Sequence, residues 1–142
     1  MATINPYLNF PGNSEEAFNF YKSVFGGEFA MIQRFKDTPE AGQVSETDKE
    51  KIMHIALPIG KGNVLMATDA IGPHESSLIA GNNFYLSVSA ESKEEADKIF
   101  NGLSAGGKVT VPLQKMFWGA YFGQFKDKFG IWWMVNYDEN RK

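Results

Sequence analysis

The chain has 142 residues, a length that predicts one domain, and its 43% hydrophobic and 22% charged residues are ordinary values for a folded globular protein. The net charge of −3 at pH 7 and the isoelectric point near 5.4 argue against nucleic-acid binding, which needs clustered Lys and Arg to neutralise phosphates. Cysteine is absent, which excludes disulfides and thiolate metal sites.

The sequence also argues against membrane insertion and secretion. The longest wholly apolar run, residues 131–135, is far shorter than the roughly 20 residues that cross a bilayer. Residues 1–6 carry neither the basic nor the apolar region of a secretion signal. We therefore expect a cytoplasmic protein with no membrane or nucleic-acid partner. The 12 Phe, 5 Tyr and 3 Trp exceed what a minimal core of this size needs, so we expect some of them to line a cavity.

The first half of the chain predicts a strand, a helix and three further strands. Residues 4–10 alternate apolar and polar side chains, which is typical of a strand with one apolar face. We expect its helix-covered face to carry Ile4, Leu8 and Phe10, and its other face to carry Asn5, Tyr7 and Asn9. Asn13 is a candidate cap for the helix, with Glu16 completing a capping box, and Gly26 or Gly27 ends it.

Further strands are predicted at residues 28–35, 52–59 and 63–69, with a polar surface loop over residues 37–50. The Gly- and Pro-containing residues 70–82 are predicted to be a linker, and His74 within them a loop residue. The second half predicts a strand at 83–89, a helix at 92–105 and strands at 108–113, 117–125 and 131–137.

The two halves repeat one another. Tyr7 matches Tyr85, Glu15-Glu16-Ala17 matches Glu94-Glu95-Ala96, and Gly26-Gly27 matches Gly106-Gly107. The offset drifts only from 78 residues (85 minus 7) to 80 residues (106 minus 26). The repeat predicts an α+β fold of two tandem βαβββ modules, at about 4–69 and 83–137, within a single domain over residues 1–142. We expect one domain because neither half has enough core to stand alone.

Two βαβββ modules in tandem resemble the vicinal oxygen chelate superfamily, which includes glyoxalase I, bleomycin-resistance proteins and extradiol dioxygenases. The sequence is most similar to its PhnB-like branch. The resemblance covers nearly the whole chain and rests on Asn5-Pro6-Tyr7-Leu8-Asn9-Phe10, Ala17-Phe18-Asn19-Phe20-Tyr21, Met53-His54-Ile55-Ala56-Leu57, Leu65-Met66-Ala67-Thr68-Asp69, Phe117-Trp118-Gly119 and residues 127–134.

The resemblance implies a cup-shaped mixed sheet with helices on its outer face, a small molecule in the cup and a homodimer. Metal-dependent relatives take His or Glu ligands from the first and last strands of each module. The corresponding positions in this chain are Asn5, Leu65, Asn83 and Met134. Because a hard divalent cation prefers carboxylate or imidazole, we predict no metal site and no cofactor.

An inward face of amides, hydroxyls and aromatic rings suits a polar organic ligand. The predicted ligand-binding residues are Asn5, Tyr7, His54, Asp69, Asn83, Tyr85, Trp118, Tyr121, Trp132 and Met134. Some of these side chains also have a structural interpretation: His54 as a cross-strand hydrogen-bonding residue, and Asp69 as a turn residue with local hydrogen bonds. Strand alternation places Trp132 and Trp133 on opposite faces.

Two functions remain open from the sequence. The first is a metal-free binding protein that holds a small organic molecule. The second is a metal-dependent lyase or isomerase acting on a small oxygenated substrate, with His54 as the candidate catalytic acid and base, since an imidazole suits proton transfer near neutral pH.

Overall fold

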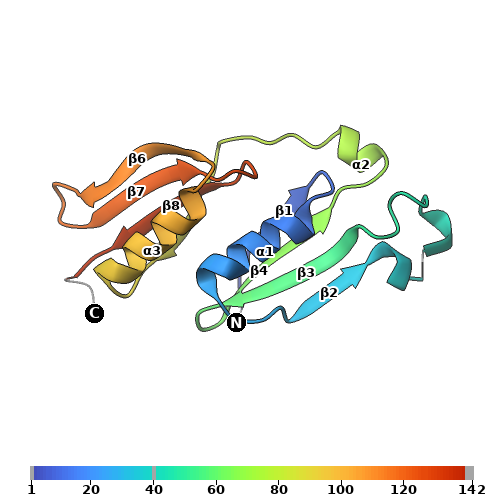
Figure 1. Cartoon of the computed structure of the whole chain (residues 1–142), viewed down its shortest axis with the longest axis horizontal. Helices are drawn as coiled ribbons and strands as arrows, with labels where there is room; N and C mark the ends of the chain where they lie inside the picture. Colours follow the sequence, from blue (N-terminus) through green and yellow to red (C-terminus); the bar gives the residue numbers. More distant parts are fainter. Residues whose placement is uncertain (1, 40, 140–142) are drawn as a thin grey trace. The chain divides into compact units, whose positions relative to one another are not determined.

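The computed structural model describes residues 2–39 and 41–139. The chain divides into two compact units, with the boundary between Ile79 and Ala80. Within the described residues, each unit holds one four-stranded sheet and one helix of 12 residues (Figure 1). The predicted α+β class and the tandem βαβββ arrangement are confirmed. The assignment of both modules to a single domain stays a prediction.

The first unit carries the sheet order β1-β4-β3-β2, with β1 parallel to β4 and the other neighbours antiparallel. Its elements are β1 (Tyr7–Phe10), α1 (Ser14–Phe25), β2 (Met31–Arg34), β3 (Ile52–Ile59), β4 (Asn63–Asp69) and the short α2 (Pro73–Ser76). Two 3-10 turns, Phe35–Asp37 and Ala41–Gln43, lie between β2 and β3.

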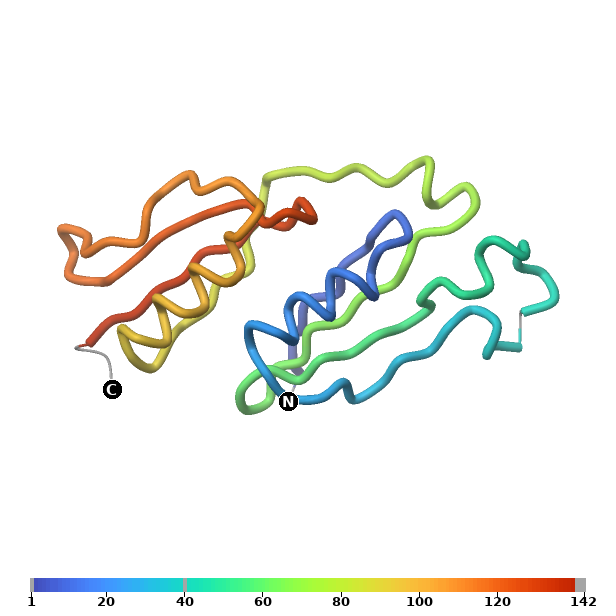
Figure 2. The backbone as a smooth tube through the Cα atoms, viewed as in Figure 1, coloured from blue at the N-terminus to red at the C-terminus, as the bar shows by residue number. Residues whose placement is uncertain are grey.

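The second unit repeats this topology with the sheet order β5-β8-β7-β6. In it β5 is parallel to β8, as β1 is to β4 in the first unit. Its elements are β5 (Leu86–Ser89), α3 (Lys93–Ser104), β6 (Lys108–Lys115), β7 (Tyr121–Lys126) and β8 (Trp132–Tyr137). In each unit the chain runs from a first strand into the helix and then through three strands, as the tube in Figure 2 traces.

Each helix packs on one face of its own sheet, and the two cores follow from the alternation of apolar side chains. The helix α1 buries Ala17, Phe18, Tyr21 and Val24, and its sheet buries Leu8, Phe10, Ile55, Leu57, Leu65 and Ala67. The helix α3 buries Ala96, Ile99, Phe100 and Leu103, and its sheet buries Phe125, Trp133 and Val135. Each fully buried large apolar side chain contributes about 1.5–3 kcal/mol relative to exposure.

Three local predictions were wrong. Ile4 is 97% exposed rather than helix-covered, because β1 begins only at Tyr7. The Asn13 side chain makes no capping hydrogen bond to α1. The strand expected from residue 117 begins at Tyr121, because Gly119, at φ +100°, closes a turn in which its N–H donates to the Met116 carbonyl at 3.0 Å.

The predicted end of α1 is confirmed, since Gly26 adopts a positive φ of 81° and donates its N–H to the Lys22 carbonyl. None of the helices in residues 2–39 and 41–139 has the length and apolar character that a bilayer-spanning segment requires.

Candidate functional site

The face of the first sheet opposite α1 carries polar side chains, and we call it the open face of that sheet. Tyr7 and Asn9 lie there because they alternate with the buried Leu8 and Phe10 along β1. Thr68 is the cross-strand partner of Asn9 and shares this face. The strand parity predicted for Tyr7 and Asn9 therefore agrees with the structure.

The open face brings two of the predicted site residues together. The Tyr7 hydroxyl and the His54 Nδ1 are 3.3 Å apart, and the two ring centroids are 5.7 Å apart. Tyr7 comes from β1 and His54 from β3, with β4 between them in the sheet. Which of the two atoms donates depends on the imidazole tautomer. A phenol paired with an imidazole in this way can hold a polar ligand atom or relay a proton.

A pocket of about 620 Å³ lies where β1 and β4 end and β3 begins. Its walls come from the sheet, from the residues around the two 3-10 turns and from the segment around α2. The lining residues are Asn9, Phe35, Gln43, Val44, Met53, Thr68, Asp69, Ala70, Ile71, His74, Ser77, Leu78 and Ile79. The sequence predicted a polar loop at 37–50 and a linker at 70–82, whereas both segments contribute walls to this pocket.

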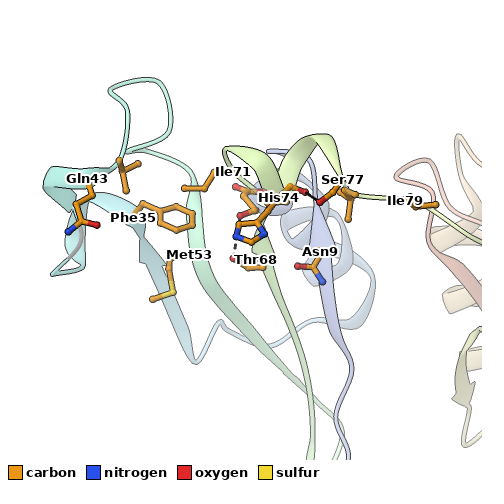
Figure 3. A pocket seen from close by; sticks show the side chains of 13 residues that line it. Asn9, Phe35, Gln43, Met53, Thr68, Ile71, His74, Ser77 and Ile79 are labelled. Atoms are coloured by element: carbon orange, nitrogen blue, oxygen red, sulfur yellow. Dashed lines mark hydrogen bonds between the residues drawn. The ribbon is translucent and has the colours of Figure 1, made fainter.

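Apolar and polar side chains line different sides of the pocket. Figure 3 shows Phe35, Met53 and Ile71 gathered on one side and Thr68, His74 and Asn9 on the other. The Asn9 amide can donate and accept hydrogen bonds, and the His74 imidazole lies on the same side of the pocket. These two side chains are therefore the groups suited to orient a polar molecule in the pocket.

Asp69 contributes to this wall but does not point from the open face as predicted. It alternates with Thr68 and lies on the helix side of β4, only 3% exposed. Its Oδ1 accepts hydrogen bonds from the Ser14 N–H at 2.9 Å and the Ser14 hydroxyl at 2.6 Å, and its Oδ2 accepts one from the Ile52 N–H at 2.8 Å. Asp69 thus has a structural role, but its partners lie 55 and 17 residues away and are not the local hydrogen-bonding groups expected of a turn residue.

The corresponding face of the second sheet carries a separate aromatic group. The rings of Tyr85 and Trp132 meet edge-on with their centroids 5.7 Å apart. The Lys126 ammonium lies 5.7 Å from the centre of the Trp132 ring. Met134 follows two residues after Trp132 and shares its face, while Trp133 is 2% exposed on the helix side. The predicted opposition of Trp132 and Trp133 agrees with this arrangement.

Trp118 lies in the turn between β6 and β7 rather than on a strand. It is 55% exposed, and its ring contacts Phe117 edge-on at 5.0 Å and Phe122 at 5.9 Å between centroids. Phe117 is 97% exposed. The predicted strand position of Trp118 was therefore wrong, although its exposure leaves it accessible to a ligand.

Tyr121 lies on the helix side of the second sheet, so its predicted orientation toward a ligand was wrong. Its hydroxyl donates to the Asp97 carboxylate of α3 at 2.7 Å, and the Lys93 ammonium lies 5.3 Å from the centre of its ring. The hydrogen bond to Asp97, burial and the negative charge of that carboxylate together raise the pKa of the Tyr121 phenol above its ordinary value.

The two predicted asparagines precede their strands. The Asn5 side-chain oxygen accepts a hydrogen bond from the Val64 N–H at 3.0 Å and so extends the pairing of the first strand with β4. Asn83 is exposed, three residues before β5. Neither side chain lines the pocket of the first unit.

The sequence and the structure were both compared with known proteins. Residues 3–135 match the family model of the "Glyoxalase/Bleomycin resistance protein/Dioxygenase superfamily". The chain belongs to this superfamily. This chain is 30% identical to "Protein YjdN" of Escherichia coli over 141 residues, which cover 94% of this chain and 93% of that protein.

Solved structures agree with this membership. The structure of protein PA1353 from Pseudomonas aeruginosa has a TM-score of 0.85 and 40% identity, covering 97% of this chain and 98% of its own. A Bacillus cereus structure described as "Putative 3-demethylubiquinone-9 3-methyltransferase, PhnB protein" has a TM-score of 0.77 and 28% identity, with 96% and 99% coverage. The predicted PhnB-like branch of the superfamily is thereby confirmed.

The metal positions that the superfamily resemblance implied do not fit a divalent ion in this PhnB-like chain. The Asn5 oxygen is already bonded to the Val64 N–H, Leu65 is an aliphatic side chain buried under α1, and Met134 offers only a thioether. Among the described residues, no three His, Asp or Glu side chains are grouped as metal ligands. Hard cations require such oxygen or imidazole donors.

Sequence reasoning missed most of the pocket. Phe35 was assigned to the end of a strand and His74 to a loop, and both line the cavity. One signal was present: the segments 37–50 and 70–82 carry the large apolar side chains Val44, Ile71, Leu78 and Ile79 among residues that otherwise are polar, Ala, Gly or Pro. Large apolar residues in a loop can indicate that the loop folds over a hydrophobic surface.

Proposed function

We propose that this chain binds a small organic molecule in the pocket of its first unit, and that binding needs no metal ion. One observation carries the proposal, namely the pocket of about 620 Å³ with mixed lining. Small-molecule sites have volumes of about 300–1,000 Å³, mostly apolar walls and a few polar groups that orient the ligand. The division between the Phe35 side and the Asn9 side fits that description.

Thermal-shift screening tests the proposal. A ligand that binds only the folded state stabilises it by RT ln(1 + [L]/Kd), so a binder raises the melting temperature. We expect hits from an amphipathic library to shift the melting temperature equally with and without EDTA. Phe35→Ala should lose these shifts, since it removes the aromatic wall of the pocket.

The matched control is Phe117→Ala, which deletes a ring that is 97% exposed in the other unit. Its ligand shifts should equal those of the wild type. Equal shifts in Phe35→Ala and wild type, or shifts that vanish with EDTA, would contradict the proposal.

We further propose that the protein is a homodimer, as the superfamily resemblance implies, and that it resides in the cytoplasm. Light scattering at micromolar concentration should give about twice the chain mass of 15.9 kDa. A monomer mass across the accessible concentration range would contradict the dimer, and recovery in the membrane or exported fraction of cells would contradict the location.

A second function is favoured by the 3.3 Å contact between Tyr7 and His54. In this alternative the chain is a metal-dependent lyase or isomerase in which His54 moves a proton on a small oxygenated substrate. Stoichiometric zinc, nickel, manganese or iron after chelator-free purification would support it. His54→Gln should then abolish turnover while the thermal shift by substrate persists.

A further inference from the structure

The charge of the pocket in the first unit restricts what it can hold. Of its lining side chains, only Asp69 and His74 are ionisable, and none is Lys or Arg. We infer that, given the binding function proposed above, the pocket takes an uncharged organic molecule with an apolar ring body and a polar end that forms hydrogen bonds, and that it discriminates against carboxylates and phosphates.

The first reason is the buried carboxylate of Asp69 in the pocket wall. Its two oxygens accept three hydrogen bonds from Ser14 and Ile52, so both act as acceptors toward protein donors. Asp69 therefore offers no hydrogen-bond donor to a carboxylate or phosphate in the pocket.

The second reason is that the Lys51 ammonium, which follows the loop that contributes to the pocket wall, is already paired with a carboxylate. The Lys51 ammonium is 2.8 Å from Asp48, and this hydrogen bond is the main cause of its raised pKa, with smaller contributions from Asp48, Glu75 and Asp69 charges. Lys51 does not line the pocket. An anionic ligand therefore finds no Lys or Arg partner in this wall, and a desolvated charge without a partner is costly.

The third reason is the arrangement of the neutral side chains. Phe35, Met53 and Ile71 form one side, which suits a ring or branched alkyl body. On the other side, the Asn9 amide is able both to donate and to accept hydrogen bonds, and His74 lies nearby. A neutral amide, alcohol or phenol can satisfy this side without bringing a charge into it.

Three probes share a naphthyl ring and differ in charge: naphthylacetamide is neutral, naphthylacetate is an anion and naphthylethylamine is a cation. The experiment uses the full chain with ¹³C-labelled Met and Ile methyl groups. The Met53 and Ile71 signals are assigned with Met53→Leu and Ile71→Val. We expect the amide to shift both signals, with a dissociation constant at least about tenfold lower than that of the acetate.

The outcomes distinguish this inference from the proposed function. If the acetate or the amine shifts the Met53 and Ile71 signals with an affinity equal to that of the amide, the inference is overturned while the pocket remains a binding site. If none of the three probes shifts these signals at millimolar concentration, both the inference and the proposed function are contradicted.

A variant of the polar side provides an internal check. Asn9→Lys places an ammonium on the open face beside the pocket, and Asn9→Gln is its uncharged control. We expect Asn9→Lys to bind the acetate at least about tenfold more tightly than Asn9→Gln does, because it supplies the missing cationic partner. Equal acetate affinities in the two variants would show that charge does not govern selection and would overturn the inference.

Discussion

The Asp69 carboxylate accepts hydrogen bonds from both the backbone N–H and the hydroxyl of Ser14, at 2.9 Å and 2.6 Å, and so joins the end of β4 to the first turn of α1. The helix start is thereby capped by a side chain 55 residues away instead of by its neighbour Asn13. An acceptor at this place also suits the positive end of the helix dipole.

We therefore predict that Asp69→Ala lowers the free energy of unfolding by about 3 kcal/mol, since it leaves the Ser14 and Ile52 donors buried without their acceptor. Urea denaturation measures this loss. Glu16→Gln is the control, because Glu16 is exposed in the same first turn of α1 and should change stability by less than about 0.5 kcal/mol. A similar loss in both variants would show that the three hydrogen bonds are not the cause.

The same cap illustrates how far the sequence predicts this fold. Apolar alternation and helical spacing determine the strands and helices of both units, because those elements bury one face. A partner distant in sequence cannot be found that way, so the role of Asp69 was missed. The pocket was missed for a related reason: the walls that close it against the sheet come from aperiodic segments, whose position depends on tertiary packing rather than on a repeat.

The turn before β7 explains another group of errors. Trp118 and Tyr121 were both expected to face a ligand from one strand, but the turn closed by Gly119 ends that strand pattern before Tyr121. Trp118 thus lies in a loop and Tyr121 points to Asp97. Tyr7 and His54 were easier to predict because both lie inside regular strands, where parity assigns the face.

Trp118 and Trp133 differ in exposure, so truncating each one compares the stability cost of losing a surface tryptophan with that of losing a core tryptophan. Trp118 is 55% exposed and Trp133 is 2% exposed. We predict that Trp118→Ala lowers the unfolding free energy by less than about 1 kcal/mol, whereas Trp133→Ala lowers it by about 3–5 kcal/mol, the usual cost of emptying a buried aromatic site. Denaturant melts of both variants test this. A core-sized loss in Trp118→Ala would make Trp118 a structural residue and remove it from the ligand-binding candidates.

Close approach of backbone makes Gly123 of β7 sensitive to substitution. A Cβ at this position would lie 2.6 Å from the Phe100 ring and 2.9 Å from the Leu113 backbone. Because the Leu113 backbone cannot rotate away as a side chain does, we predict that Gly123→Ala destabilises the second unit by about 1–3 kcal/mol. Gly42→Ala is the control, since a Cβ there meets nothing within 4 Å. Equal stability of the two variants would contradict the close packing of α3, β6 and β7.

The ion pair between Arg34 of β2 and Glu15 of α1 should make stability depend on acid pH. The two terminal guanidinium nitrogens of Arg34, Nη1 and Nη2, donate to the Glu15 carboxylate at 3.0 Å and 2.7 Å. These hydrogen bonds, with the opposing effect of burial and the further attraction of the Arg34 charge, lower the pKa of Glu15 below its ordinary value of 4.5. A carboxyl with a lowered pKa in the folded state stabilises that state above the unfolded-state pKa, and the contribution disappears as pH falls through the folded-state pKa.

Because the Glu15 side chain is 45% exposed, solvent screening limits the contribution to about 0.5–1 kcal/mol. We predict that the wild type exceeds Glu15→Gln by this amount in unfolding free energy at neutral pH, and that the difference shrinks steadily once the pH falls below 4.5. Urea titrations of both proteins from neutral to acid pH measure it, and other carboxylates cancel because both proteins carry them. A difference that persists unchanged in strong acid would mean that Glu15 acts through packing and not through its charge.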